Sequence, residues 1–559
     1  MSKILGLGGS SHDYSAVLMI DGEIVIGIED ERLIRRKHAI SYWFEIPCLS
    51  SVNYCLEHAG IPSIDDIDFV VGGDILPIRT IRHFPQMKTV NHHLLHALSA
   101  YQFSDQKDMA VLVMDGCGAF VRRSNKIGQY ENRETISFYR ASLKEMACLG
   151  STVGKSLREV DAFSRGISNS LGYLYNLITH LIGFGKRQEG KTMGLAGYGR
   201  PIYTEPIRKR VGLSDDFNSV FQIDLPNDDL IAELEAILKK NNDSFDTRAD
   251  LAASIQLIFE EVLEHCSNLL LKRTGCKHIA LAGGCALNSL ANGKLEDKLS
   301  SKGTKLHLLP FVNDAGQAFG ALAWQARKLG LEKPIRFRGS NDSVSLSHCG
   351  YEYSDSEILS ALNKAYPRIE FCKIETPEDC LSAILASDKI IGYFDGGSEF
   401  GPRALGYRSI LASPVTPQIR ERLNREIKGR EPFRPIAPII SRDKFAEYFE
   451  GPDDKPYMIS TAYVKRGKAQ QIPSVTHVDR TARVQTLNEF QNPMLYRLLN
   501  AFYRESGCHV LCNTSFNGPG EPIVESPENA IDCFLRLGLD FLYLQGYLVW
   551  RPKNTKVMA

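Results

Sequence analysis

The chain has 559 residues, and its 66 lysines and arginines balance 66 aspartates and glutamates, so the formal net charge is zero. A neutral chain has no overall basic surface for nucleic acid or for acidic membranes. The sequence shows no signal peptide and no run of about 18 apolar residues that could span a bilayer. We therefore expect a cytoplasmic protein with no nucleic-acid or membrane partner. Its length predicts roughly three or four structural units.

The N-terminal part of the chain contains two similar β-rich openings. In the first, Asp21-Gly22 separates two apolar runs, which is a strong signal for a β-hairpin. In the second, an apolar run ends at Asp115 and is followed by a glycine-containing loop and another β-prone run. Two such openings predict a duplicated fold. The expected strands cover residues 3–8, 15–20, 23–28, 109–115 and 135–139.

A third block has the order strand, glycine loop, helix, which is typical of a phosphate cradle. A strand at 278–282 is followed by two glycines and by a helix-like run at 286–299. Such a loop lets the backbone approach a phosphate. The alternative is a tight turn between strand and helix. The candidate nucleotide-binding residues are Gly116, Gly118, Gly283, Gly284 and Asn288.

A segment rich in proline, glycine, serine and charged residues, at 332–354, predicts a boundary between two domains near residue 345. The expected domains are residues 1–345 and 346–559. In the second domain, the strands at 389–394 and 509–512 lead into polar loops. Loops at strand ends are the usual ligand-binding positions of α/β sheets.

A pair of histidines predicts a metal site in the first domain. His92 and His96 are four residues apart, so on a helix they share one face and can bind one ion. Asp115 and Asp314 follow or begin polar loops and complete a set of nitrogen and oxygen ligands that suits iron, zinc or manganese. The alternative is a pair of packed or surface histidines. His93 lies on an adjacent face and is expected to be a structural neighbour.

The second domain carries basic residues that predict an anion site. Arg403 and Arg434 are flanked by glycine, proline and apolar residues, which suggests enclosed loops, whereas Arg420, Arg422 and Arg425 fit a solvated helix face. Guanidinium groups match phosphate oxygens in pairs. The candidate residues for this anion site are Arg403, Lys428, Arg434, Asn513 and Ser515.

Taken in order, the motifs resemble those of the carbamoyltransferases of natural-product and nodulation-factor biosynthesis, over nearly the whole chain. The set is highly specific, although each motif alone is not. The matches are Ser-His-Asp at 11–13, Glu-Asp-Glu-Arg-Leu-x-Arg-x-Lys-His at 29–38, His-His-Leu-x-His-Ala at 92–97, Glu-Gly-Lys-Thr-Met-Gly-Leu-Ala-Gly-Tyr-Gly at 189–199, Gly-Gly-Cys-Ala-Leu-Asn at 283–288, Asn-Asp-Ala-Gly at 313–316, Gly-Pro-Arg-Ala-Leu-Gly at 401–406, Phe-Arg-Pro-Ile-Ala-Pro at 433–438 and Asn-Thr-Ser-Phe-Asn at 513–517.

This resemblance implies an α/β protein with a duplicated, actin- and sugar-kinase-like N-terminal domain, similar to the tRNA threonylcarbamoyl transferases, and a YrdC-like C-terminal domain. The C-terminal domain would make carbamoyl adenylate from carbamoyl phosphate and ATP. The N-terminal domain would move the carbamoyl group to a hydroxyl of a small-molecule acceptor, as in antibiotic biosynthesis. The resemblance assigns Fe²⁺ to the metal residues and carbamoyl phosphate and ATP to the anion site. Mg²⁺ can accompany ATP.

His12 is the candidate base that takes the acceptor proton, because an ordinary imidazole titrates near neutral pH. The alternative is a histidine that only closes a loop. Asp13 would orient that imidazole, and Lys37 would hold the carbamoyl carbonyl or a phosphate. Glu189 would face the acceptor, and Lys191 would pair with a nearby acid.

The sequence leaves the acceptor and the oligomeric state open. Ser10 stands where aminoglycoside-acting relatives carry an acid, so a polycationic acceptor is not supported. Three rival functions remain: a tRNA threonylcarbamoyladenosine-type enzyme, which RNA binding would reveal; a small-molecule kinase, which would consume ATP without carbamoyl phosphate; and a non-catalytic nucleotide-binding protein on the same fold. The intact candidate residues of both sites count against the last.

Overall fold

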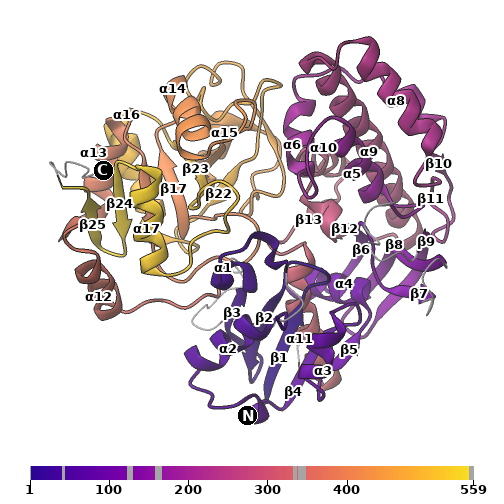
Figure 1. The fold of residues 1–559 in the computed structure, drawn as a ribbon, viewed down its shortest axis with the longest axis horizontal. Helices are drawn as coiled ribbons and strands as arrows, with labels where there is room; N and C mark the ends of the chain where they lie inside the picture. The colour runs from indigo at the N-terminus through magenta and orange to yellow at the C-terminus, as the bar shows by residue number, and fades with distance from the viewer. Residues whose placement is uncertain are drawn as a thin grey trace.

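The computed structural model describes residues 2–40, 45–122, 130–157, 166–331, 336–337 and 348–552. The boundary expected near residue 345 lies outside these ranges, so the division into residues 1–345 and 346–559 stays a prediction. Figure 1 shows two sheets from the first part of the chain at the lower centre and right, and a third from the last part at the left.

The first sheet is built on the predicted hairpin. Strand β2 is antiparallel to both β1 and β3, β4 is added parallel to β1, β5 is parallel to β4, and β14 is parallel to β3. The sheet order is β14-β3-β2-β1-β4-β5. The strands are β1 (Lys3–Gly8), β2 (Ser15–Ile20), β3 (Glu23–Glu29), β4 (Phe69–Gly73), β5 (Lys88–Val90) and β14 (Arg336–Phe337).

The second sheet repeats this topology. Strands β6, β8 and β9 are antiparallel, β12 is parallel to β6, and β13 is parallel to β12. This order, twice in one chain, is that of the actin and sugar-kinase class and confirms the predicted duplication. The strands are β6 (Asp108–Met114), β7 (Phe120–Arg122), β8 (Tyr130–Ser142), β9 (Met146–Leu157), β12 (His278–Ala282) and β13 (Lys305–His307).

Helix α4 (His92–Gln102) and helix α11 (Gln317–Lys328) pack together unusually closely. A Cβ added at Gly320 of α11 would lie 2.0 Å from the carbonyl oxygen of Leu95 in α4, and one at Gly6 of β1 would lie 2.1 Å from the carbonyl oxygen of Ala318. Glycine is therefore required where α11 meets both the other helix and the first sheet. This packing holds the candidate metal ligands of α4 beside the N-terminus of α11.

The second sheet is covered by helices whose ends are marked in the sequence. The longest, α9 (Phe245–Thr274), begins after Ser244, whose side chain accepts a hydrogen bond from the Thr247 amide, and ends at Gly275 with φ +69°. The other helices of the first two sheets are α1 (Asp30–Ile34), α2 (Leu49–His58), α3 (Ile78–His83), α5 (Leu171–Leu181), α6 (Glu189–Ala196), α7 (Thr204–Arg208), α8 (Asp228–Lys240) and α10 (Ser289–Ser300); β10 (Gly212–Leu213) and β11 (Phe221–Gln222) form a small ribbon.

The C-terminal part forms a mixed sheet in the order β15-β25-β24-β16-β17-β23-β18-β22 around one apolar core. This is an α/β unit, and its expected YrdC likeness stays a prediction. Its strands are β15 (Glu370–Lys373), β16 (Ile391–Phe394), β17 (Arg408–Ala412), β18 (Ala437–Ser441), β22 (Gln485–Leu487), β23 (Val510–Ser515), β24 (Phe541–Leu544) and β25 (Tyr547–Trp550), with β19 (Phe449–Glu450), β20 (Ala462–Val464) and β21 (Thr481–Ala482) in a second small sheet. Its helices are α12 (Asp355–Ala365), α13 (Pro377–Ala386), α14 (Pro417–Glu421), α15 (Phe445–Tyr448), α16 (Pro493–Ser506) and α17 (Pro527–Leu537). Within the described ranges, every helix is too short or too polar to cross a bilayer.

Candidate functional site

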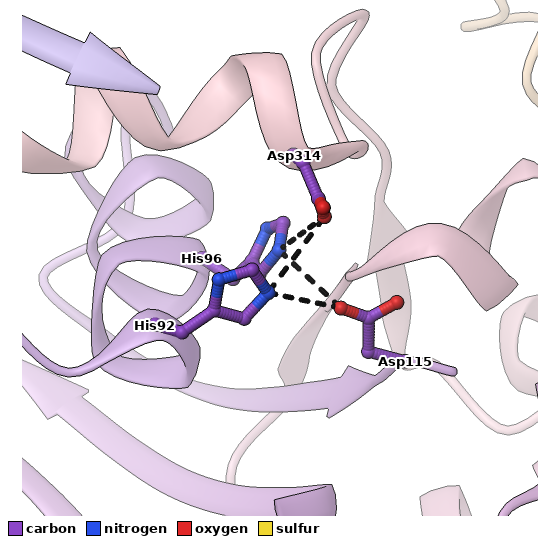
Figure 2. Close-up of side chains that lie close together, drawn as sticks. All are labelled: His92, His96, Asp115 and Asp314. Atoms are coloured by element: carbon purple, nitrogen blue, oxygen red, sulfur yellow. Dashed lines mark hydrogen bonds and ion pairs between the residues drawn. The ribbon is translucent and has the colours of Figure 1, made fainter. Parts of the chain in front are cut away.

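The four predicted metal ligands meet in the first part of the chain (Figure 2). His92 and His96 come from the first turns of α4, Asp115 directly follows β6, and Asp314 begins the short helix η4 (Asp314–Gly316) ahead of α11. All four side chains are buried, and one ligand atom of each lies within 4.8 Å of the others. Residues more than 200 positions apart in sequence are thus brought to one point.

The distances within this cluster suit ligands of a single ion. His92 Nε2 lies 3.0 Å from Asp115 Oδ2 and 3.7 Å from Asp314 Oδ1; for His96 Nε2 the corresponding distances are 3.9 and 3.4 Å. Metal–ligand bonds of about 2.0–2.2 Å place neighbouring ligand atoms about 3.0–3.6 Å apart. Two imidazole nitrogens and two carboxylate oxygens form a donor set for a divalent first-row metal.

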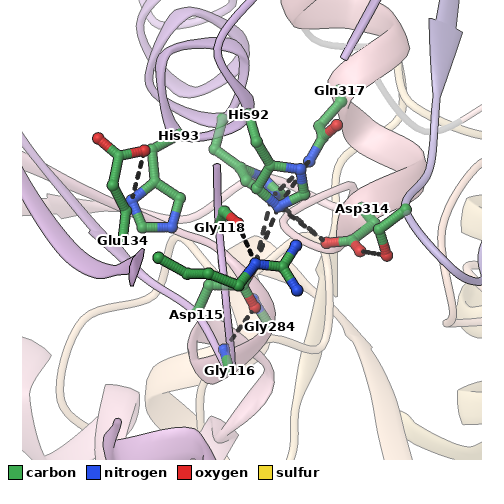
Figure 3. A network of polar contacts seen from close by, with 12 residues as sticks. His92, His93, Asp115, Gly116, Gly118, Glu134, Gly284, Asp314 and Gln317 are labelled. Atoms are coloured by element: carbon green, nitrogen blue, oxygen red, sulfur yellow. Dashed lines mark hydrogen bonds and ion pairs between the residues drawn. The ribbon is translucent and has the colours of Figure 1, made fainter. Parts of the chain in front are cut away.

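Gln317, which no sequence motif had singled out, contacts the His92 ring of this cluster from one side (Figure 3). Its Nε2 lies 2.6 Å from His92 Nδ1 and 3.0 Å from His96 Nε2. On the other side, the Ser10 hydroxyl donates to Asp314 Oδ2. His96 Nδ1 and Gln317 Oε1 are buried without a hydrogen-bond partner among the described residues. The one sequence signal for Gln317 was its position three residues after Asp314.

The histidines of the cluster stabilise its carboxylates, although Asp115 and Asp314 repel each other. Burial opposes ionisation of Asp115 and Asp314, but the neighbouring histidines outweigh it and hold the pKa of both carboxyl groups below the usual range. Burial also opposes charge on His92, yet its hydrogen bond to Asp115 raises the pKa of that imidazole. His93 differs: burial lowers its pKa, and its Nδ1 lies 2.6 Å from the Ser137 hydroxyl, so it has the structural environment expected of it.

The predicted glycine loops lie against the same carboxylate. The amides of Gly116 and Gly284 donate to Asp115 Oδ1 at 2.8 and 3.2 Å. Gly283 has φ +88°, and a Cβ there would lie 2.4 Å from the Met114 carbonyl oxygen, so only glycine fits this turn. Gly118 packs against His93, and a Cβ there would lie 2.3 Å from its Nε2. Both loops border the candidate metal ligands, and their binding of a nucleotide stays a prediction.

Asn288 has structural partners in this arrangement. Its side chain accepts a hydrogen bond from the Ala291 amide at 3.1 Å and thereby caps α10. Its amide group also exchanges hydrogen bonds with the side chain of Gln256, at 2.9 and 3.1 Å. These contacts fix the start of the helix that follows the glycine turn.

His12 lies in the loop between β1 and β2 and is paired with Asp13. Its Nδ1 is 3.0 Å from Asp13 Oδ2. Burial opposes the charged imidazole, but the Asp13 carboxylate outweighs it and raises the pKa of His12 to about 9. Repulsion from a cation in the nearby cluster would lower this pKa. The predicted orientation of His12 by Asp13 is thus compatible with the geometry.

Lys37 and Glu189 lie on different elements. Lys37 begins the short helix η1 (Lys37–Ala39) and is close enough to the C-terminal part to contribute to the lowered pKa of Lys428. Glu189 begins α6 and accepts a hydrogen bond from the Asn176 side chain. Lys191, two residues later, pairs with Glu431 at 2.6 Å, as expected.

Four arginines converge in the C-terminal part. Burial, and then repulsion from Arg434, lowers the pKa of Arg403 to about 10 and that of Arg430 to about 9. Burial and repulsion from the other three lower the pKa of Arg483 well below its usual value. Within the described part of the chain, Arg403 Nε and Arg483 Nε are buried without a hydrogen-bond partner. Arg483 was missed because no motif surrounds it.

Lys428 is held by the loop after β23. Its Nζ donates to Ser515 Oγ at 3.3 Å and to the carbonyl and side-chain oxygens of Asn517 at 2.9 and 2.7 Å. Burial, and then repulsion from Arg430, lowers the pKa of Lys428 well below its usual value. Asn513 is fully buried and donates to Gln485 Oε1 at 2.8 Å and to the Ala404 carbonyl at 3.4 Å. It therefore supports the loop that carries Arg403.

Comparisons with known proteins match both parts of the chain. Residues 3–75 and 72–323 match the model of the carbamoyltransferase N-terminus, and residues 382–551 that of the carbamoyltransferase C-terminus. The chain is 30% identical to an uncharacterized protein of Synechocystis, sll1178, over 98% of this chain and 97% of that protein. It is also 30% identical to the nodulation protein NolNO of Sinorhizobium fredii, over 96% of this chain and 79% of the relative. A crystal structure of full-length HypF in its phosphate- and nucleotide-bound form is 15% identical, covers 59% of this chain and 56% of its own, and gives a TM-score of 0.37.

Proposed function

Because this chain belongs to the carbamoyltransferase family, we propose that it is an ATP-dependent O-carbamoyltransferase. Carbamoyl phosphate, ATP and water yield carbamoyl adenylate, pyrophosphate and phosphate. A hydroxyl group of a small-molecule acceptor, a natural product or a glycan, then displaces AMP and becomes carbamoylated.

The observation that carries the proposal is the convergence of Arg403, Arg430, Arg434 and Arg483. Burial lowers the pKa of all four arginines, and repulsion from neighbouring arginines lowers it further for Arg403, Arg430 and Arg483, so the folded protein holds positive charge that an anion would stabilise. Guanidinium groups bind phosphate oxygens in pairs. Both proposed substrates are phosphates, and Lys428 with Ser515 lies in the same region of positive charge.

The four-residue cluster would hold a divalent metal, and its donors suit Fe²⁺. Such an ion would act as a Lewis acid that stabilises negative charge on a departing phosphate. His12, held by Asp13, would take the proton of the acceptor hydroxyl, and Lys37 would hold the carbamoyl oxygen or a phosphate. Gly116, Gly118, Gly283 and Gly284 would bring backbone amides close to the nucleotide, and Glu189 would face the acceptor.

Variants of the arginine cluster test the activation half. Arg403→Ala and Arg483→Ala should each weaken carbamoyl phosphate binding at least tenfold and abolish pyrophosphate formation from ATP. Arg425→Ala is the matched control, because Arg425 is exposed and paired with Glu421 at 3.2 Å. Binding is measured by calorimetry. Unchanged binding in both cluster variants would contradict the proposed anion site.

A second set of variants separates activation from transfer. His12→Asn should retain pyrophosphate formation and lose carbamoyl transfer, whereas His92→Ala should lower metal content and transfer together. Transfer is followed from radiolabelled carbamoyl phosphate. Full transfer by His12→Asn would exclude His12 as the base. Transfer to tRNA instead of to small hydroxyl acceptors would identify the threonylcarbamoyladenosine-type rival.

A further inference from the structure

The carboxylate of Asp13 lies between two imidazole rings. Its Oδ2 is 3.0 Å from His12 Nδ1, and its Oδ1 is 3.0 Å from His38 Nδ1. The two rings are 6.4 Å apart between centroids and nearly perpendicular. His38 comes from η1, which follows α1, whereas His12 and Asp13 belong to the loop after β1. Two separate segments of the chain therefore share one carboxylate.

Two of these residues have an unusual backbone conformation. Asp13 and His38 have φ of +54° and +63°, in the left-handed region that residues other than glycine rarely adopt. The Asp13 amide donates to the His38 carbonyl oxygen at 2.9 Å, and the His38 amide donates to Glu31 Oε2 at 2.6 Å. Left-handed residues persist where surrounding contacts fix them, and they are concentrated at functional sites.

Asp13, Glu31 and His38 also lie close enough together to be considered as cation ligands. Contacts within the chain account for their geometry instead: His12 lies at ion-pair distance from Asp13, and His38 makes hydrogen bonds to Asp13 and Glu31. Each Asp13 oxygen already faces an imidazole nitrogen, and a Glu31 oxygen accepts the His38 amide. The carboxylate is thereby fixed from two sides.

We propose that His38 is a positioning residue for carbamoyl transfer. By holding the second oxygen of Asp13, it fixes the carboxylate that orients His12, so that His12 binds Asp13 through Nδ1 and presents Nε2 to the acceptor. The relation resembles that of a carboxylate that holds a catalytic histidine in one tautomer. This inference rests on the proposed function, because it assigns His38 to the transfer step alone.

Other charged groups also surround the two imidazole rings. Asp314 and Arg187 face His12 with opposite charges, and Glu31 faces His38. Arg36, next to η1, is engaged by Glu45 at 2.5 Å. Asp13 touches both rings. Removal of His38 would therefore leave Asp13 with His12 as its imidazole partner.

The test compares His38→Ala, His38→Asn and wild type, with His83→Ala as the matched control because His83 is exposed on α3. Pyrophosphate formation from ATP and carbamoyl phosphate reports the activation half, and AMP release with triacetylchitotriose as the probe acceptor reports transfer. Crystal structures of the variants report the positions of Asp13 and His12.

We expect His38→Ala to lower the kcat of transfer about tenfold, with the KM for the acceptor and pyrophosphate formation unchanged, and to displace the Asp13 carboxylate. Asparagine can donate a hydrogen bond from nearly the same position, so His38→Asn should restore transfer to within about threefold. Normal transfer, or unmoved His12 and Asp13, in His38→Ala would overturn the role of His38. Absence of pyrophosphate formation in wild type would instead overturn the proposed function. If wild type forms pyrophosphate and does not use the probe acceptor, the positions of Asp13 and His12 in the crystal structures decide the question.

Discussion

Gly320→Ala should disrupt the candidate metal site of His92, His96, Asp115 and Asp314 without touching any of these residues. The added Cβ would lie 2.0 Å from the Leu95 carbonyl oxygen and 2.7 Å from its carbonyl carbon. Relief of this clash requires α4 and α11 to separate by about 1 Å, whereas metal sites tolerate changes of about 0.2 Å in ligand distances. His96 directly follows Leu95, so the movement reaches the ligands.

Gly320→Ala is expected to lower both the stability of the fold and its affinity for a metal ion. Overpacking of a tight helix contact destabilises a protein by about 1–3 kcal/mol, although alanine itself favours a helix over glycine by about 1 kcal/mol. Displacement of ligands that are supported by their surroundings lowers metal affinity by about 10–100-fold. Thermal unfolding and metal analysis by mass spectrometry measure the two effects.

Gly190→Ala in α6 is the matched control, because a Cβ at this helical glycine meets no atom within 4 Å. It should leave metal content unchanged and preserve or slightly raise thermal stability. Wild-type metal affinity in Gly320→Ala would refute the argument that the contact between α4 and α11 sets the geometry of the cluster.

Three further predictions concern other parts of the molecule. Burial raises the pKa of Asp395 from 3.8 to about 6, so its charged form destabilises the folded state and stability falls as pH rises between these values. Asp395→Asn should therefore raise the free energy of unfolding at pH 8 by at most about 3 kcal/mol, with a higher thermal midpoint than wild type, and should show little difference near pH 3. Phe433 lies between Arg430 and Arg434 in the sequence, and the centroid of its ring lies 6.1 Å from that of Phe184 and 6.3 Å from that of Tyr198. Phe433→Ala removes this aromatic packing, so calorimetry should show about tenfold weaker binding of carbamoyl phosphate. Unchanged binding would show that the aromatic contact does not support the anion site. Asn288→Ala should lower stability in nucleotide-free protein by about 1–2 kcal/mol through loss of the α10 cap, and an effect seen only with nucleotide would assign Asn288 to binding instead.

The sequence predicted best the features that depend on local pattern. The hairpin around Asp21 and Gly22 and the repeat of its topology from β6 follow from apolar alternation and turn residues. The i,i+4 spacing of His92 and His96 predicted that these two residues lie together, and they form half of the candidate metal site. Asp115 and Asp314 joined it because they occupy loops at the ends of elements, where folded chains bring polar groups together.

Other site residues depend on tertiary packing and left little trace in the sequence. Arg483 stands between β21 and β22 without a motif, and its place in the arginine cluster appears only when those strands fold beside Arg403. His38 was part of a recognised motif, yet its contact with Asp13 requires two left-handed residues in separate segments. Sequence spacing cannot predict such a contact, because it depends on how the two loops meet.

The most direct test of the central claim is ATP–pyrophosphate exchange by the full chain without an acceptor, in the presence and absence of carbamoyl phosphate. We expect exchange with carbamoyl phosphate and none without it, because the arginine cluster and Lys428 are proposed to bind the anion from which the adenylate is made. Exchange that does not depend on carbamoyl phosphate, or no exchange when the metal-loaded protein receives both substrates, would contradict it.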